Sequence, residues 1–167
     1  VVVTDVNPDA VRDLVARHPS VRAVNDVDDL VREELDVYSP NALGGALDEV
    51  TVDLLRARIV CGGANNQLVS EGHGGTAERL RERGITYAPD FLVNAGGVIQ
   101  VSDELHGFDM ERARRRTATI FDHTLEVLRS ADAEDVTPAV AADRLAERRI
   151  AAGGPRPWLP AGEHRDT

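Results

Sequence analysis

A chain of 167 residues with 42% hydrophobic content is long enough for one domain with its own core, because a domain of about 150 residues buries roughly 70% of its unfolded surface. The net charge of −10 opposes binding to nucleic-acid phosphates or anionic lipids, so we expect neither partner. The single cysteine, Cys61, cannot form an internal disulfide and is expected to be a small buried residue. No apolar run approaches the roughly 20 residues of a membrane helix, and we expect a cytoplasmic protein.

Apolar runs alternate with helical patterns through the first half of the chain. Strands are predicted over residues 1–5, 21–24, 35–40, 59–61 and 85–88, and helical segments over 10–18, 25–34, the stretch through Leu54 and Leu55, and 75–83. Helical crossovers between strands indicate a mostly parallel sheet with helices on both faces. Aromatic residues make up only 4% of the chain, which suits a core of Val, Leu, Ile and Ala. The fold class is therefore predicted to be α/β.

The second half of the chain is predicted to be helical. A long helix is expected from Met110 to Arg129, and Thr137 is a plausible N-cap for a further helix that begins at Pro138 and runs through Ile150. Residues 153–167 are rich in Gly and Pro, and we expect them to form a disordered tail. The expected organisation is one domain over residues 1–152 followed by this tail.

Asp5 lies at the carboxyl end of the first predicted strand. At that position of a dinucleotide-binding fold, a carboxylate can accept hydrogen bonds from both ribose hydroxyls of the adenosine half, and it would repel the 2′-phosphate of NADP. Asp5 is therefore a candidate NAD-binding residue. A helix cap or a solvated turn explains an aspartate at this position equally well.

Two glycine-rich turns follow later strands. Ala42 precedes Gly44 and Gly45 in the first, and Gly63 stands in the second, and small residues at both would let a ligand approach the backbone. A tight turn between strand and helix is the alternative explanation for each. The histidines show no metal-ligand spacing, and we assign them no role.

Two asparagines, Asn65 and Asn94, are set in glycine-rich turns at the ends of apolar, strand-like runs. A primary amide offers two donors and an acceptor, which suits a nicotinamide carboxamide or the amine and carboxylate of a substrate. Asparagine also tolerates left-handed turns, so the backbone alone can explain each. Because open α/β sheets bind ligands at the carboxyl ends of their strands, we favour the binding role for both residues.

Gly96 and Gly97 are predicted to begin a helix that carries Val98 and Val101 on one face. These two valines could line an apolar pocket, although core packing is the commoner use of such a pair. The positive N-terminal end of this helix suits an anionic ligand.

On the basis of these turns, the chain resembles the C-terminal, NAD-binding domain of the glutamate/leucine/phenylalanine/valine dehydrogenase family. Within that family it is most similar to the leucine and valine dehydrogenases. The resemblance is carried by Ser-Pro-Asn-Ala-Leu-Gly-Gly, by Gly-Ala-Asn-Asn-Gln-Leu and by Tyr-Ala-Pro-Asp-Phe-Leu-Val-Asn-Ala-Gly-Gly-Val-Ile, in that order, and extends from Val1 to about Arg149. It implies a Rossmann-like, doubly wound sheet with C-terminal helices.

The resemblance also implies a reaction and a set of roles. The reaction is oxidative deamination of a branched-chain L-amino acid with NAD, which yields a 2-oxo acid and ammonium. Asp5 would hold the adenosine ribose, and Asn94 would position nicotinamide or substrate. Ala42, Gly63 and Asn65 would flank the nicotinamide and its ribose, and Asn65 could also contact the substrate. Val98 and Val101 would shape an aliphatic side-chain pocket, and family members are oligomeric.

The sequence departs from the family pattern in two respects. The first strand with its Gly-x-Gly-x-x-Gly turn is missing, and all nineteen basic residues are arginine, whereas the family's catalytic lysines lie in an N-terminal domain. We therefore expect this chain to be part of a longer enzyme, with no catalytic residue of its own and no activity alone. The alternatives are a nucleotide-binding module without catalysis and an oligomerisation domain.

Overall fold

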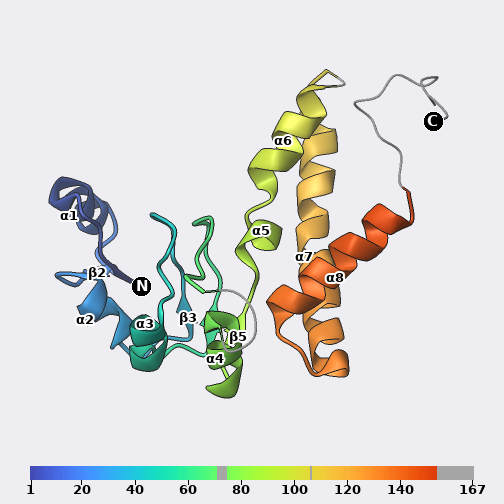
Figure 1. Ribbon diagram of the computed structural model, residues 1–167. Coiled ribbons are helices and arrows are strands. Elements are labelled where there is room, and N and C mark those ends of the chain that lie inside the picture. Colours follow the sequence, from blue (N-terminus) through green and yellow to red (C-terminus); the bar gives the residue numbers. More distant parts are fainter. Residues whose placement is uncertain (71–74, 106, 154–167) are drawn as a thin grey trace. The chain divides into compact units, whose positions relative to one another are not determined.

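The computed structural model describes residues 1–70, 75–105 and 107–153. Within it the chain forms two compact units, Val1–Asp90 and Phe91–Thr167, which are treated separately below (Figure 1). His73 and His106 lie outside the described residues, as does the expected tail from residue 154 onward. The organisation into one domain over residues 1–152 stays a prediction. No described helix combines the length and apolarity that crossing a bilayer requires.

The first unit confirms the predicted alternation of strands and helices. Its elements, in chain order, are β1 (Val2–Val3), α1 (Pro8–Arg17), β2 (Arg22–Ala23), α2 (Val27–Val31), β3 (Val37–Tyr38), α3 (Glu49–Leu54), β4 (Ile59–Val60), α4 (Thr76–Glu82) and β5 (Thr86–Tyr87). All strand pairs are parallel, as helical crossovers require.

The strands fall into two groups. β1 pairs with β2, with Val2 opposite Arg22, and β3, β4 and β5 form a second group in that order. In the second group Tyr38 is opposite Val60, which is opposite Tyr87. The assigned strands are shorter than the predicted ones, although flanking residues continue the hydrogen bonding: the N–H of Val24 donates to the carbonyl of Val3 at 3.0 Å and that of Ala88 to Val60 at 2.9 Å.

Polar side chains cap the N-termini of helices α1 and α3. The Asn7 side chain accepts from the backbone N–H of Asp9 at 3.0 Å, and Asp48 accepts from Thr51 at 2.7 Å. The loop after α4 contains Gly84 at φ +70°, the left-handed conformation that glycine adopts most readily. Gly84 therefore follows the C-cap of this helix, Arg83.

The core of the first unit is aliphatic. Its fully buried members are Leu47, Val52, Val60 and Leu80. Tyr38 of β3 and Tyr87 of β5 are buried in the same cluster. Burial of each large aliphatic side chain contributes about 1.5–3 kcal/mol, so this cluster is the main source of the unit's stability.

The second unit is helical. It contains α6 (Gly96–Glu104), α7 (Met110–Glu134) and α8 (Pro138–Ala151), preceded by the short α5 (Asp90–Val93). α6 begins at Gly96, as predicted. The strand-like reading of the run before Asn94 was wrong: Phe91 to Val93 are helical, and Asn94 lies in a turn between α5 and α6. Short apolar runs do not separate strand from helix by pattern alone.

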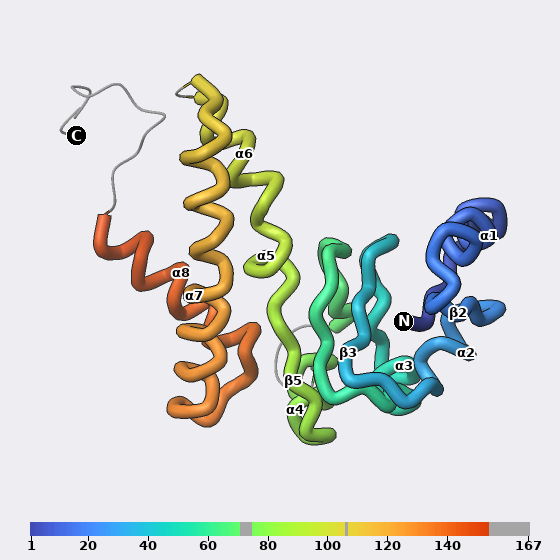
Figure 2. Tube along the Cα trace, turned by 180° about the vertical axis from the view of Figure 1, so that it is seen from behind, coloured from blue at the N-terminus to red at the C-terminus, as the bar shows by residue number. Residues whose placement is uncertain are grey.

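Small side chains bring α7 and α8 together. Val127 and Ala131 of α7 pack with Ala141 and Ala142 of α8, and Figure 2 shows the two helices from behind. α7 is longer than predicted and ends at Glu134, and its C-cap, Asp135, is left-handed at φ 55°. Thr137 caps α8 by accepting from the N–H of Val140 at 3.3 Å, which confirms the predicted start.

Candidate functional site

The carboxyl ends of β1 and β3 meet at one groove of the first unit. The groove has a volume of about 590 Å³ and is lined by residues 1–5 on one side and by residues 34–39, 41 and 42 on the other, with Leu30. Asp5 and Ala42 both line it, so two residues predicted from separate strands lie at the same cavity. Such an edge is where open parallel sheets bind ligands.

Asp5 is exposed and does not cap α1. Its Oδ1 accepts from the backbone N–H of Asn7 at 2.8 Å, which tightens the turn that leads into the helix, and Asn7 is the cap. The carboxylate is therefore held at the end of β1 by one bond to the backbone, and it stays accessible to a ligand in the groove.

Two loops, residues 40–47 and 62–67, are joined by backbone hydrogen bonds. The N–H of Ala64 donates to the carbonyl of Pro40 at 2.9 Å, and the N–H of Gly45 donates to the carbonyl of Asn66 at 2.8 Å. The Asn41 side chain adds a bond, because its Oδ1 accepts from the N–H of Gly63 at 2.9 Å. Ala42 and Gly63 thus belong to one connected pair of turns.

Glycine at two positions is explained by this close approach. A Cβ on Gly62 would lie 2.2 Å from the carbonyl oxygen of Pro40, and one on Gly44 would lie 2.8 Å from that of Asn65. At Gly62 and Gly44, therefore, the tight-turn explanation is the better one. A Cβ on Gly63 would meet only the Asn41 side chain, at 3.0 Å, and Gly63 remains exposed to a ligand.

Asn65 is exposed at the tip of the second turn, and its neighbour Asn66 adopts the left-handed backbone at φ 53°. The conformational requirement of this turn is thus met by Asn66. Asn65 does not adopt the left-handed backbone, so that explanation of an asparagine does not apply at this position. Cys61, expected to be buried, is only half-buried just before these turns.

A buried glutamine, Gln67, is hydrogen-bonded to the backbone of the second turn. The Nε2 of Gln67 donates to the carbonyls of Gly62 and Ala64 at 2.9 and 2.8 Å, and the Gln67 side chain is fully buried. Its backbone N–H donates to Oδ2 of Asp90, itself buried, at 2.7 Å. Sequence reasoning missed Gln67 and Asp90, which lie within two of the quoted motifs but carry no local signal of burial.

The remaining candidates lie in the second unit. Asn94 is half-buried between α5 and α6, and Val98 and Val101 of α6 are 73% and 63% exposed. Core packing within the described unit therefore does not explain these two valines.

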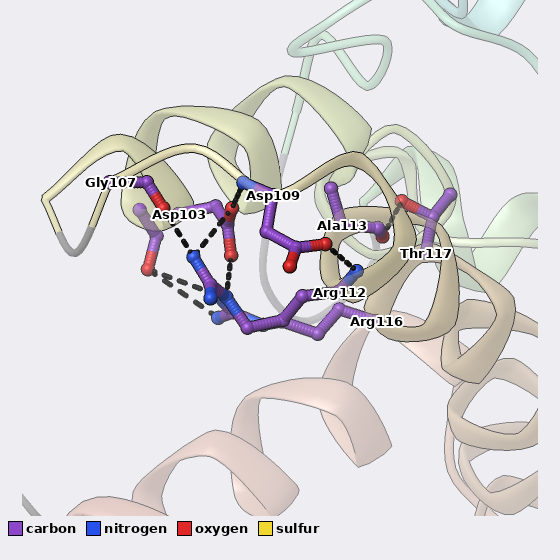
Figure 3. A network of polar contacts seen from close by, with 8 residues as sticks. Asp103, Gly107, Asp109, Arg112, Ala113, Arg116 and Thr117 are labelled. Carbon is purple, nitrogen blue, oxygen red and sulfur yellow. Dashed lines mark hydrogen bonds and ion pairs between the residues drawn. The ribbon is translucent and has the colours of Figure 1, made fainter.

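An ion pair holds the turn between α6 and α7 (Figure 3). The fully buried Asp103 accepts from Nη2 of Arg112 at 2.9 Å and from the backbone N–H of Asp109 at 2.7 Å. The hydrogen bonds from Arg112 and, to a smaller extent, from the backbone of Asp109 lower the pKa of Asp103 below its usual value. These contacts join two helices, and no ligand is required to explain them. Among the described residues, no three His, Cys, Asp or Glu side chains form a group that could hold a metal ion.

The model of the Glutamate/Leucine/Phenylalanine/Valine dehydrogenase family matches residues 5–152. The chain therefore belongs to this family of amino acid dehydrogenases.

Individual relatives agree with that assignment. A valine dehydrogenase of Streptomyces coelicolor is 56% identical over 94% of this chain and 43% of its own length. A leucine dehydrogenase of Bacillus subtilis is 42% identical over 89% of this chain and 40% of its own length. The structure of L-tryptophan dehydrogenase from Nostoc punctiforme is similar with a TM-score of 0.84 and 36% identity, over 91% of this chain and 45% of the other. The chain spans less than half the length of these relatives.

Proposed function

We propose that this chain is the NAD-binding part of a dehydrogenase that oxidatively deaminates a branched-chain L-amino acid, valine or leucine, to a 2-oxo acid and ammonium. The observation that carries the proposal is the meeting of Asp5 and Ala42 at one groove, with Gly63 tied to the Ala42 loop by a 2.9 Å bond from its N–H to Asn41. Membership of an amino acid dehydrogenase family supports the reaction class.

The side chains at this edge fit the two ends of NAD. The exposed Asp5 carboxylate offers acceptor capacity for ribose hydroxyls, and its charge opposes a 2′-phosphate. Ala42 and Gly63 expose backbone beside which a nicotinamide ribose can lie, and the Asn65 amide can pair with the carboxamide. When bound, NAD accepts the α-hydride of the amino acid. No residue of the chain is assigned acid–base catalysis, and we predict no turnover by the 167 residues alone.

Asn94, Val98 and Val101 are proposed to contact the substrate. The exposure of both valines supports an apolar surface for an aliphatic side chain, since neither is used in the core of its unit. Valine and leucine are the substrates named for two of the relatives, which supports the same choice. Assembly with further copies of the chain is also proposed, and the exposed apolar side chains of Phe121 and Ile150 on α7 and α8 support it.

A calorimetric titration with NAD and with NADP tests the cofactor assignment. We expect NAD to bind more tightly, and Asp5→Asn to weaken NAD binding about 10- to 100-fold, because hydrogen bonds to a charged group are lost. Asp9→Asn, at another exposed aspartate in the first turn of α1, is the matched control and should leave the affinity unchanged. Equal binding of NAD and NADP by the unsubstituted chain would refute the role of Asp5.

A further inference from the structure

One peptide unit of the second turn, the one that joins Gly62 to Gly63, is hydrogen-bonded to a side chain at each end. Its N–H, on Gly63, donates to Oδ1 of Asn41 at 2.9 Å, and its carbonyl, on Gly62, accepts from Nε2 of Gln67 at 2.9 Å. Because the N–H and C=O of a trans peptide point in opposite directions, Asn41 and Gln67 hold this peptide from opposite sides.

The peptide needs such bonds to keep one orientation, because it lies between two glycines. Neither Gly62 nor Gly63 carries a Cβ to restrict the neighbouring backbone angles, so the peptide can rotate about its own axis with little steric resistance. A half-turn would exchange the directions of its N–H and C=O. Bonds at both ends exclude that half-turn, because it would set the carbonyl against Oδ1 of Asn41 and the N–H against Nε2 of Gln67.

Asn41 is exposed and lines the groove, yet its side chain bonds to the protein itself. Its Nδ2 donates to the backbone carbonyl of Ser39 at 2.9 Å and to the Ser39 hydroxyl at 3.0 Å. An asparagine amide has two donors and one acceptor oxygen, so both donors are used and Oδ1 accepts from Gly63. The bonds to Ser39 therefore orient the amide that holds the peptide.

Gln67 holds the carbonyl side of the turn from a fully buried position. Its Nε2 donates to the carbonyls of Gly62 and Ala64, which stand on either side of Gly63, whereas its Oε1 is buried with no hydrogen-bond partner among the described residues. A buried acceptor without a partner is unfavourable, and the reversed amide would be worse, because Oε1 would then face two carbonyls. A glutamine that is only half satisfied here indicates the importance of the two bonds that it donates.

We propose that Asn41 and Gln67 are positioning residues, which fix the orientation of the peptide between Gly62 and Gly63 so that the nicotinamide ribose lies on the exposed backbone of Gly63. The inference rests on the proposed function, which assigns the nicotinamide half of NAD to this turn and the adenosine half to Asp5. Loss of either side chain is therefore expected to affect the binding of the nicotinamide half alone.

The affinities of NAD and AMP, measured by calorimetric titration on the 167-residue chain, separate the two halves of the site. AMP carries the adenosine ribose but no nicotinamide, so it reports on Asp5 and not on the second turn. We expect Asn41→Ala to weaken NAD binding about three- to tenfold, the effect of one lost hydrogen bond, and to leave the affinity for AMP unchanged. Asn25→Ala is the matched control, because Asn25 is also exposed and donates from its side-chain amide to Asp29 at 3.1 Å. It should change neither affinity.

The two ligands also distinguish this inference from the proposed function. If the unsubstituted chain binds neither NAD nor AMP, the proposed function fails, and the inference that rests on it fails with it. If the chain binds both, and Asn41→Ala weakens NAD and AMP equally or weakens neither, the positioning role is overturned while the proposed function stands.

Amide exchange measured by NMR tests the orientation of the peptide without a ligand. Gln67→Met removes the donor at the carbonyl end of the peptide but leaves the Asn41 acceptor at its N–H end in place. We expect the Gly63 amide to exchange about tenfold faster in this variant, whereas the Gly45 amide, which donates to the carbonyl of Asn66 in the same pair of loops, stays unchanged. Equal acceleration of both amides, or of neither, would contradict the proposal. If Gln67→Met does not fold, Asn41→Ala at an exposed position still decides.

Discussion

The backbone N–H of Gln67 donates to the buried carboxylate of Asp90 at 2.7 Å, and this bond connects the second glycine-rich turn to the residue that begins α5. The N–H of Asp90 donates in turn to the Tyr87 hydroxyl at 3.2 Å. The turn that presents Gly63 and Asn65 is therefore supported by a buried polar network. One member of the network is unsatisfied, because the buried Oε1 of Gln67 has no hydrogen-bond partner among the described residues.

Gln67→Met tests this support. Methionine is similar in length and unbranched, but it leaves the carbonyls of Gly62 and Ala64 without their donor. We expect a loss of about 2–5 kcal/mol in the free energy of unfolding, because each buried unsatisfied group costs about 1–3 kcal/mol. Gln100→Met on the exposed face of α6 is the control, with an expected change within about 0.5 kcal/mol. Urea denaturation measures both, and equal losses would contradict the network.

Gly62→Ala tests the contact between the two turns. The added Cβ would lie 2.2 Å from the carbonyl oxygen of Pro40, so the loops must separate. We expect about 3 kcal/mol of destabilisation, the upper end of overpacking costs. Gly96→Ala, where nothing lies within 4 Å, should be neutral or stabilising by up to about 1 kcal/mol, since it begins a helix. A neutral Gly62→Ala in thermal unfolding would refute the close approach.

Asp103 should make the stability of the second unit depend on pH. Its pKa is lowered by Arg112, so its contribution is fully present above the unfolded value of about 3.9 and is lost as pH falls through the lower, folded value. We expect Asp103→Asn to lower the Tm at neutral pH, with a difference that shrinks below about pH 4.

Glu134→Gln is the matched control for Asp103. It removes a carboxylate that also pairs with an arginine, Arg144, but its side chain is 35% exposed where that of Asp103 is fully buried. Exposed pairs contribute little, so its Tm should fall much less. Equal drops in Tm for the two variants would show that burial of Asp103 has no consequence.

Val98 and Val101 should contribute little to folding. Both are more than half exposed, and we expect Val98→Ala and Val101→Ala to change the free energy of unfolding by less than about 0.5 kcal/mol. Val127→Ala, at a side chain that is 1% exposed in the same unit, should cost about 2 kcal/mol. A loss at Val98 or Val101 comparable to that at Val127 would show that these valines are structural, and would remove them from the proposed substrate surface.

The order of strands and helices in the first unit was predictable, because apolar runs and their bounding turns are local signals. The end of α7 was not, since an aspartate, Asp135, takes the left-handed position that a glycine usually marks. Asn94 was assigned to a strand end because a short apolar run precedes it, and the short helix α5 has the same composition.

Among the site residues, Asp5 and Ala42 could be predicted to meet, because carboxyl ends of parallel strands share one edge. The supporting pair could not be predicted. Gln67 and Asp90 are separated by 23 residues, and only the folded chain shows that both are buried and bonded. The need for glycine at position 62 could not be predicted either, because it arises from the close approach of Pro40 in the folded chain.

The most direct test of the proposed cofactor site is NMR mapping of NAD binding on the isotope-labelled chain. We predict concentration-dependent shifts for the amides of Asp5, Ala42, Gly63 and Asn65, with those of Ala23 and Val127 unaffected as internal controls. Shifts that cluster away from the carboxyl ends of β1, β3 and β4, or none at millimolar NAD, would contradict the assignment of this edge as the cofactor site.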